Sequence, residues 1–146
     1  MFIGDVVNSG AIPSLELTLR FAGERHRLIA HNIANWTTPN FQPVDVSPAG
    51  FQRALSGAIE RRREQPGGGS GELSLHGSRE LSRLPGGRLV LTPRTPSAGI
   101  LGHDRNNTEP ERLVQDLAEN YGVYRVASDL LRSRLQQLRD AIAERV

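Results

Sequence analysis

The carboxyl-terminal part of the chain repeats apolar side chains at a spacing that few folds can use. The steps between them alternate strictly between three and four residues, and only one member, a serine, is neither apolar nor aromatic. The series is Val114, Leu117, Tyr121, Tyr124, Ser128, Leu131, Leu135, Leu138 and Ile142. This alternation places one stripe along a helix and is typical of coiled coils. Thr108 and Glu111 have the spacing of a capping box, which predicts a helix of ~35 residues and ~52 Å. A helix of this length needs another helix to cover its stripe.

A second stripe near the amino terminus offers that partner. It has the same alternating spacing, with His26 as its one polar member, and comprises Ile12, Leu15, Leu19, Ala22, His26, Ile29 and Ile33. Leu17, Phe21 and Leu28 form an adjacent apolar stripe, so this helix is expected to contact more than one neighbour. The two patterns predict a mainly α fold. In it, helices over residues 12–33 and 110–143 pack as an antiparallel coiled coil.

The ten residues from Asn32 to Phe41, NIANWTTPNF, end the first helical pattern. Asparagine side chains bond nearby backbone groups, and Pro39 keeps Thr38 out of the helical region, so the stretch predicts a stop followed by a turn. Two large apolar side chains, Trp36 and Phe41, nevertheless lie in this polar turn. They indicate a corner that docks on another molecule. A helix end whose aromatic side chains cover the protein's own core would show the same sequence.

The segment between the two helices has a weaker pattern. Ser47-Pro48 can open a short helix with Phe51, Leu55 and Ile59 on one side, and residues 88–91 can form a strand. Residues 65–71 have the composition of a flexible linker, and residues 92–107 that of an irregular loop. The chain is thus expected to comprise an N-terminal helix and corner (1–41), a small irregular or partly β middle segment (42–107) and a C-terminal helix (108–146). A single chain of this kind is expected to have little core of its own.

Several chemical functions find no support in the residues present. The chain has no cysteine, which excludes disulfides, thiolate metal sites and cysteine nucleophiles. His26 and His31 are ~140° apart around a helix, so they do not face one ligand. No spaced catalytic motif occurs, and we expect neither an enzyme, nor a metal, nor a cofactor. No apolar run approaches the ~18 residues of a membrane-spanning helix, and residues 1–13 lack the features of a cleaved signal peptide.

The basic middle of the chain raises nucleic-acid binding as an alternative. Residues 51–105 contain nine arginines against five acidic residues, and the whole chain has arginine but no lysine. The run Arg61 to Arg63 could contact phosphates. However, no aromatic side chains interleave with this run, and runs of arginine are usually solvated. An arginine-rich nucleic-acid-binding protein is therefore the less favoured interpretation.

Two separated segments resemble one family. Asn32, Ile33, Ala34, Asn35, Thr38, Pro39 and Phe41 fit the pattern N-[IL]-A-N-x-x-T-P-G-[YF], which resembles the asparagine-rich signature of bacterial flagellar rod and hook proteins. The usual glycine is Asn40, a residue that also accepts a positive φ. Asn106-Asn107-Thr108, followed by Leu117-Ala118-Glu119-Asn120 and Tyr124-Arg125, resembles the C-terminal segment of the flagellar basal-body rod protein B family.

The resemblance implies a structural subunit of the bacterial flagellar rod that assembles into a helical axial tube in the periplasm. It implies export through the flagellar type III channel without a cleaved signal, and helices that order on docking. Expected partners are further copies, other rod subunits and the basal adaptor protein at the membrane ring, with no nucleic acid and no direct membrane insertion. A generic coiled-coil adaptor or oligomerisation protein is the second interpretation. The residues expected to form assembly contacts are Asn32, Ile33, Asn35, Trp36, Thr38, Pro39, Phe41, Leu117, Tyr121, Tyr124, Leu131, Leu135 and Leu138.

Overall fold

The computed structural model describes residues 10–65, 73–76, 79–83, 88–95 and 110–144. This part of the chain contains helices α2 (Ile12–Asn35), α3 (Pro48–Glu64) and α4 (Pro110–Ala143), and strands β1 (Leu81–Arg83) and β2 (Leu89–Leu91). The described fold is therefore mainly helical with a small two-stranded sheet in the middle of the sequence, as the sequence predicted. None of the helices in these ranges has the length and apolar character needed to cross a membrane.

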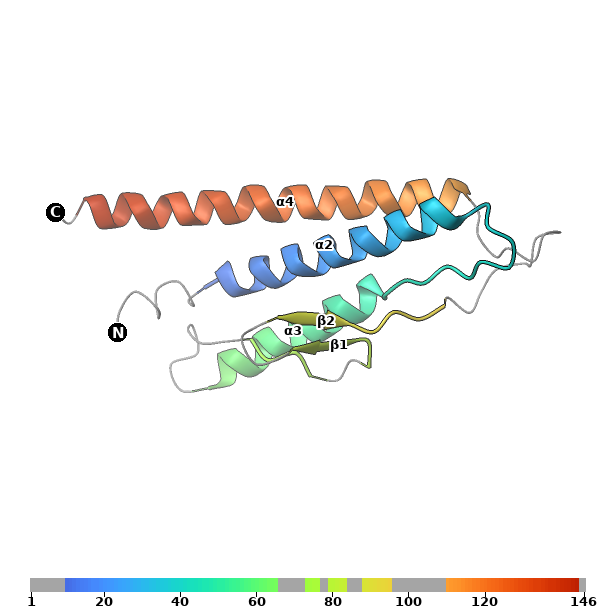
Figure 1. Ribbon diagram of the computed structural model, residues 1–146. Helices are drawn as coiled ribbons and strands as arrows, with labels where there is room; N and C mark the ends of the chain where they lie inside the picture. The colour runs from blue at the N-terminus through green and yellow to red at the C-terminus, as the bar shows by residue number, and fades with distance from the viewer. Residues whose placement is uncertain (1–9, 66–72, 77–78, 84–87, 96–109, 145–146) are drawn as a thin grey trace.

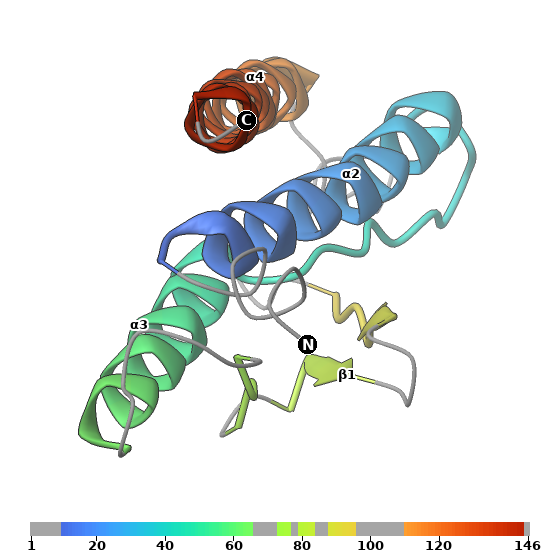
Figure 2. The same cartoon turned by 90° about the vertical axis from the view of Figure 1, so that its left-hand side faces the viewer.

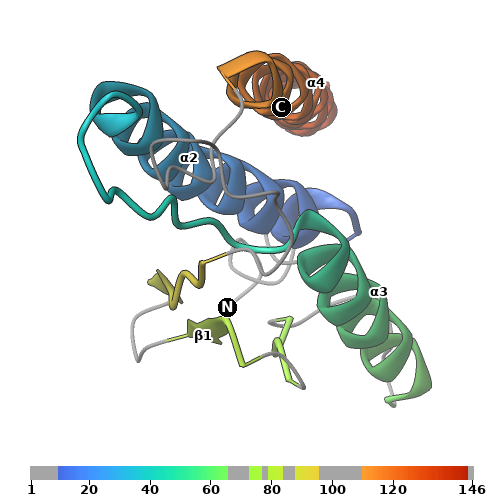
Figure 3. The ribbon, with the colours of Figure 1, turned by 90° about the vertical axis from the view of Figure 1, so that its right-hand side faces the viewer.

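Helix α2 lies between two layers (Figures 1, 2 and 3). Helix α4 packs along one side of it, running in the opposite direction, while α3 and the two strands lie on the other side. With 34 residues, α4 is ten residues longer than the 24-residue α2, which corresponds to ~15 Å of helix. The C-terminal turns of α4 consequently extend past the start of α2 (Figure 1).

The hydrophobic core lies between α2, α3 and the strands. Phe21 of α2 stacks on Phe51 of α3, with ring centroids 4.1 Å apart and planes 6° from parallel. The other buried members are Leu17, Val46, Ala54, Ala58, Leu73, Leu75, Leu81 and Leu89. The adjacent stripe of α2 thus contacts a second neighbour, as predicted. The expectation that a single chain has little core of its own is wrong, because the middle segment folds against α2.

Helix α3 begins where its sequence predicts. The Ser47 Oγ accepts a hydrogen bond from the Gly50 N–H at 3.0 Å, and Pro48 occupies the first turn, where its missing N–H is not needed. Phe51, Ala54 and Ala58 form its buried face. Leu55 and Ile59, which the sequence placed beside Phe51, are only half-buried at the edge of the core. Most of the predicted linker, from residue 66 onward, lies outside the described residues.

The two strands form an antiparallel pair in which Leu81 lies opposite Leu91. Strand β2 confirms the extended segment predicted over residues 88–91. Strand β1 was not predicted, because its glycine-rich surroundings hide a run of only three residues. An isolated bridge between Asp45 and Arg94, with both N–H···O distances at 2.9 Å, joins the segment after α2 to the segment after β2. The predicted loop 92–107 is described only up to residue 95.

The face of α4 that packs on α2 differs in part from the stripe predicted from the sequence. In one column of the stripe, Leu117, Leu131 and Leu138 are half-buried as expected, whereas the fourth member, Tyr124, is 45% exposed. The other column is not buried: Val114, Tyr121 and Ile142 are each more than half exposed. The positions buried instead are Leu113, Asn120 and Ala127.

Polar and small side chains explain why α4 turns this face toward α2. Asn120 donates its Nδ2–H to the carbonyl oxygen of Ala22 at 2.9 Å, and Asp116 accepts a hydrogen bond from Arg25. Ala127 lacks the bulk that would hold the helices apart. A pattern of apolar residues takes no account of hydrogen bonds or of small side chains. It therefore wrongly predicted that the column with Val114, Tyr121 and Ile142 packs on α2. The predicted N-cap, Thr108, lies outside the described residues, while Pro110 and Glu111 are in the first turn as expected.

Candidate assembly surface

A buried arginine holds the two helical layers together. The Arg25 side chain on α2 donates from Nε to Asp45 Oδ1 at 3.0 Å and from Nη2 to Asp45 Oδ2 at 2.7 Å. Its Nη2 also donates to Asp116 Oδ1 on α4 at 3.1 Å. Burial alone would lower the pKa of Arg25, but the hydrogen bonds and charges of Asp45 and Asp116 outweigh it and raise that pKa above its usual value. One guanidinium group therefore fixes α4, α2 and the segment after α2 relative to one another.

Sequence reasoning missed Arg25 and placed His26 in the interface instead. His26 is exposed, whereas Arg25 is only 5% exposed. A signal was present in the chain: Arg25 lies three residues after Ala22 and four before Ile29, the same spacing that defined the apolar stripe. Of these two adjacent polar residues, the predicted stripe included His26, whereas the buried one is Arg25.

The predicted corner stops the helix and turns the chain with its own side chains. Asn32 is buried, and its Nδ2–H donates to the Val44 carbonyl at 2.8 Å while its Oδ1 accepts from the Val44 N–H at 3.1 Å. Asn35 donates from Nδ2 to the His31 carbonyl at 2.8 Å. Asn40 has a φ of 59°, which confirms that it adopts the conformation usually reserved for glycine.

These contacts separate the corner residues into two groups. Asn32 holds the returning chain against α2 and presents no side chain to another molecule, and Phe41 packs its ring edge-on to His31 with centroids 5.6 Å apart. Ile33 and Asn35 are half-buried. Trp36 is 43% exposed, and Thr38 and Pro39 are exposed. The exposed group forms the part of the corner that can meet a partner.

Helix α4 exposes apolar side chains on both flanks of the face that packs on α2. Successive residues turn by about 100° around a helix, which places Val114, Tyr121 and Ile142 on one side (the first flank). Val123, Val126 and Leu130 lie on the other side (the second flank), with 47%, 59% and 51% exposure. The strip between the flanks, pointing away from α2, is exposed and has no large apolar residue: Gln115, Gly122, Asp129 and Gln136, each seven residues from the next.

The second flank was not predicted from the sequence. Its members are spaced by three and four residues, which is a helical spacing that the sequence does contain. The prediction used only the longer stripe from Val114 to Ile142. The pair of Arg125 with Asp129 was predicted and is confirmed at 3.2 Å. Both side chains are exposed, so this pair lies in water along the polar strip and stabilises the helix only slightly.

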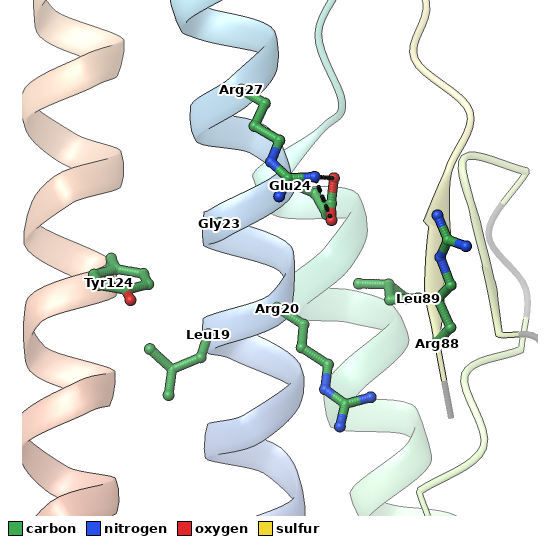
Figure 4. A pocket seen from close by; sticks show the side chains of 8 residues that line it. All are labelled: Leu19, Arg20, Gly23, Glu24, Arg27, Arg88, Leu89 and Tyr124. Carbon is green, nitrogen blue, oxygen red and sulfur yellow. Dashed lines mark hydrogen bonds and ion pairs between the residues drawn. The ribbon is translucent and has the colours of Figure 1, made fainter. Parts of the chain in front are cut away.

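A hollow of about 530 Å³ lies over α2 between α4 and β2 (Figure 4). Tyr124 of α4 and Leu19 of α2 line one side, and Leu89 lines the other (Figure 4). Its remaining lining is Arg20, Gly23, Glu24, Arg27 and Arg88. These side chains include no nucleophile beside a base, and no group of three potential metal ligands occurs among the described residues. The hollow thus offers surface for contact and no set of groups arranged for a reaction.

Comparison with known protein families and with curated protein sequences finds no match to this chain.

Proposed function

We propose that this chain is a structural subunit of the bacterial flagellar basal-body rod, whose terminal helices assemble by coiled-coil packing into a helical axial tube. The observation that supports this most is the exposure of apolar side chains on both flanks of α4. A helix that packs on one neighbour in a monomer normally has one apolar stripe and polar side chains elsewhere. Helix α4 has apolar residues for two further neighbours.

The spacing on the first flank suits a coiled coil with another subunit. Val114, Tyr121, Leu135 and Ile142 belong to one series of positions seven residues apart, which stays on one side of a gently supercoiled helix. The C-terminal turns of α4 extend past the start of α2 (Figure 1), and we propose that a helix of a neighbouring subunit packs there. A helix that meets one neighbour on each flank can continue as a lattice. Head-to-tail contacts that do not close into a ring then give a helical assembly.

The exposed corner and the family resemblance support a proposal for the partners. Trp36, Thr38 and Pro39 are exposed beside a turn that Asn35 and Asn40 already complete. The proposed partners are further copies, other rod subunits and the basal adaptor protein. The proposed place is the periplasm-spanning rod, reached by export without a cleaved signal. In this proposal the protein is not an enzyme, needs no cofactor, binds no nucleic acid and does not insert into the membrane.

The test is an acidic substitution on a flank compared with the same substitution on the polar strip. Leu130→Asp adds a charge to the second flank, whereas Gln136→Asp adds one to the polar strip six residues later. Both positions are exposed, so each change should alter the free energy of unfolding by less than ~0.5 kcal/mol. Sedimentation velocity of the purified chain should show assemblies with Gln136→Asp and monomers with Leu130→Asp. Equal assembly of both variants would contradict the proposal.

A generic coiled-coil adaptor is the second candidate function, favoured by the same first flank. An adaptor that uses only this flank forms a closed dimer or trimer, whose size stops growing with protein concentration. An axial subunit that uses both flanks continues to grow. Sedimentation across a concentration series therefore separates the two candidates.

A further inference from the structure

A second hollow, of about 550 Å³, lies in the layer on the opposite side of α2 from α4. Arginines from three separate segments line it: Arg53 from α3, Arg79 from the segment before β1, and Arg94 from the segment after β2. Its other polar lining includes His76, Glu80 and Ser47. Core packing of Phe51, Leu81 and Leu89 holds the backbone of these segments together, and the three arginine side chains are exposed on them.

The charges of this hollow are unbalanced. The Glu80 Oε2 accepts a hydrogen bond from the Ser47 N–H at 2.9 Å, and the Ser47 Oγ already caps α3. Within the described part of the chain, none of the three arginines forms an ion pair. Arg25 shows the contrast, since its guanidinium lies between two carboxylates. Three guanidinium groups thus face one hollow that provides a single carboxylate.

We propose that this hollow binds an acidic segment, rich in Asp and Glu, of a neighbouring protein in the assembly. Guanidinium groups bind carboxylates with two parallel hydrogen bonds and remain charged at all physiological pH values. The inference rests on the proposed function, because a subunit of a growing assembly meets its neighbours on more than one surface. The flanks of α4 are apolar contact surfaces, and the arginine hollow is a separate, charged surface across α2 from them. Its charge specifies an acidic partner surface.

The composition of the hollow favours a peptide over a nucleic acid. Single-stranded nucleic acid binds where aromatic side chains give the bases a stacking platform along a basic groove. No aromatic residue lines this hollow apart from His76. Its arginines also surround one site instead of following a track along the surface. Carboxylate side chains on a short segment suit such a site.

The test uses the full chain and a fluorescein-labelled hexaglutamate peptide, with binding followed by fluorescence anisotropy at low and at physiological salt. The variant Arg53→Gln/Arg79→Gln/Arg94→Gln removes the three charges and keeps long polar side chains. A matched control, Arg132→Gln/Arg134→Gln/Arg139→Gln, removes the same charge from exposed positions on α4. We expect the hollow variant to bind the peptide at least about tenfold more weakly, since three charge-assisted bonds are lost, and the control to change by less than about twofold. Circular dichroism of both variants establishes that each is folded.

Three outcomes would overturn the inference. An equal loss in both triple variants would mean general attraction between opposite charges. Displacement of the peptide by inorganic phosphate at the same carboxylate-equivalent concentration would assign the hollow to a small oxyanion. Tighter binding of single-stranded DNA of equal charge, dependent on the same three arginines, would assign it to nucleic acid. Assembly is measured separately with Leu130→Asp and Gln136→Asp, so the hollow inference can fail while the proposed function stands.

Discussion

Replacing Arg25 with alanine should loosen both layers of the protein at once. The change removes three hydrogen bonds to Asp45 and one to Asp116, and leaves both carboxylates without their cation. Breaking a buried ion pair from one side costs about 3–5 kcal/mol. Here the carboxylate side chains are 22% and 27% exposed, so water can partly replace the guanidinium. We therefore expect the free energy of unfolding to fall by about 2–3 kcal/mol.

Arg27→Ala is the matched control, because it removes the same side chain from the opposite side of α2, two residues later. Arg27 is 79% exposed and meets Glu24 at 3.4 Å, so its loss should cost less than ~0.5 kcal/mol. Urea unfolding followed by far-ultraviolet circular dichroism gives both values. A loss for Arg25→Ala below ~1 kcal/mol, or one equal to that of Arg27→Ala, would refute the reasoning that this ion pair network joins the layers.

Four further predictions follow from other contacts. Asn120→Ala should cost about 1–3 kcal/mol, because it removes a buried bond to the Ala22 carbonyl, and hydrogen exchange should speed up in α4 more than in α3. Asn32→Ala should cost about 1–3 kcal/mol in urea unfolding by leaving the Val44 backbone groups unpaired, whereas Asn40→Gly should be neutral within ~0.5 kcal/mol. Asn35→Ala should impair assembly more than Asn40→Gly does in sedimentation, and equal effects would contradict a role for the corner in assembly. The raised pKa of Arg25 means that its contribution to stability is complete below its usual pKa and is lost only at higher pH. The difference in unfolding free energy between the wild type and Arg25→Met, compared at pH 6 and at pH 9, should therefore be the same.

The elements that local sequence determines could be predicted. Ser47-Pro48 set the start of α3 because the cap and the proline act within one turn. The C-terminal end of α2 followed from the asparagines and Pro39 in the same way. The positive φ of Asn40 was expected because the pattern that this segment resembles has glycine at that position. Strand β1 could not be predicted, because three residues give too short an alternation to detect against neighbouring glycines.

The packing of α4 was only half predictable because specific polar contacts decide it. The apolar pattern could not distinguish Asn120 and Ala127 from surface residues, yet these two are buried against α2. Arg25 was missed for the same reason, since a charged side chain is buried only when its partners are present, and Asp116 is 91 residues away in sequence. The consequence for function is direct. Tyr121, expected at the interface between the two helices of one chain, lies instead on an exposed flank.

The central claim is that both flanks of α4 become covered when subunits assemble and that its polar strip does not. The chain contains no cysteine, so single cysteines at Tyr121, Leu130 and Gln136 report on the first flank, the second flank and the polar strip. The rate of maleimide labelling is measured for each, before and after assembly. We expect strong protection at positions 121 and 130 and unchanged labelling at position 136. Equal labelling at all three positions in the assembled state would contradict the account, as would protection of only one flank.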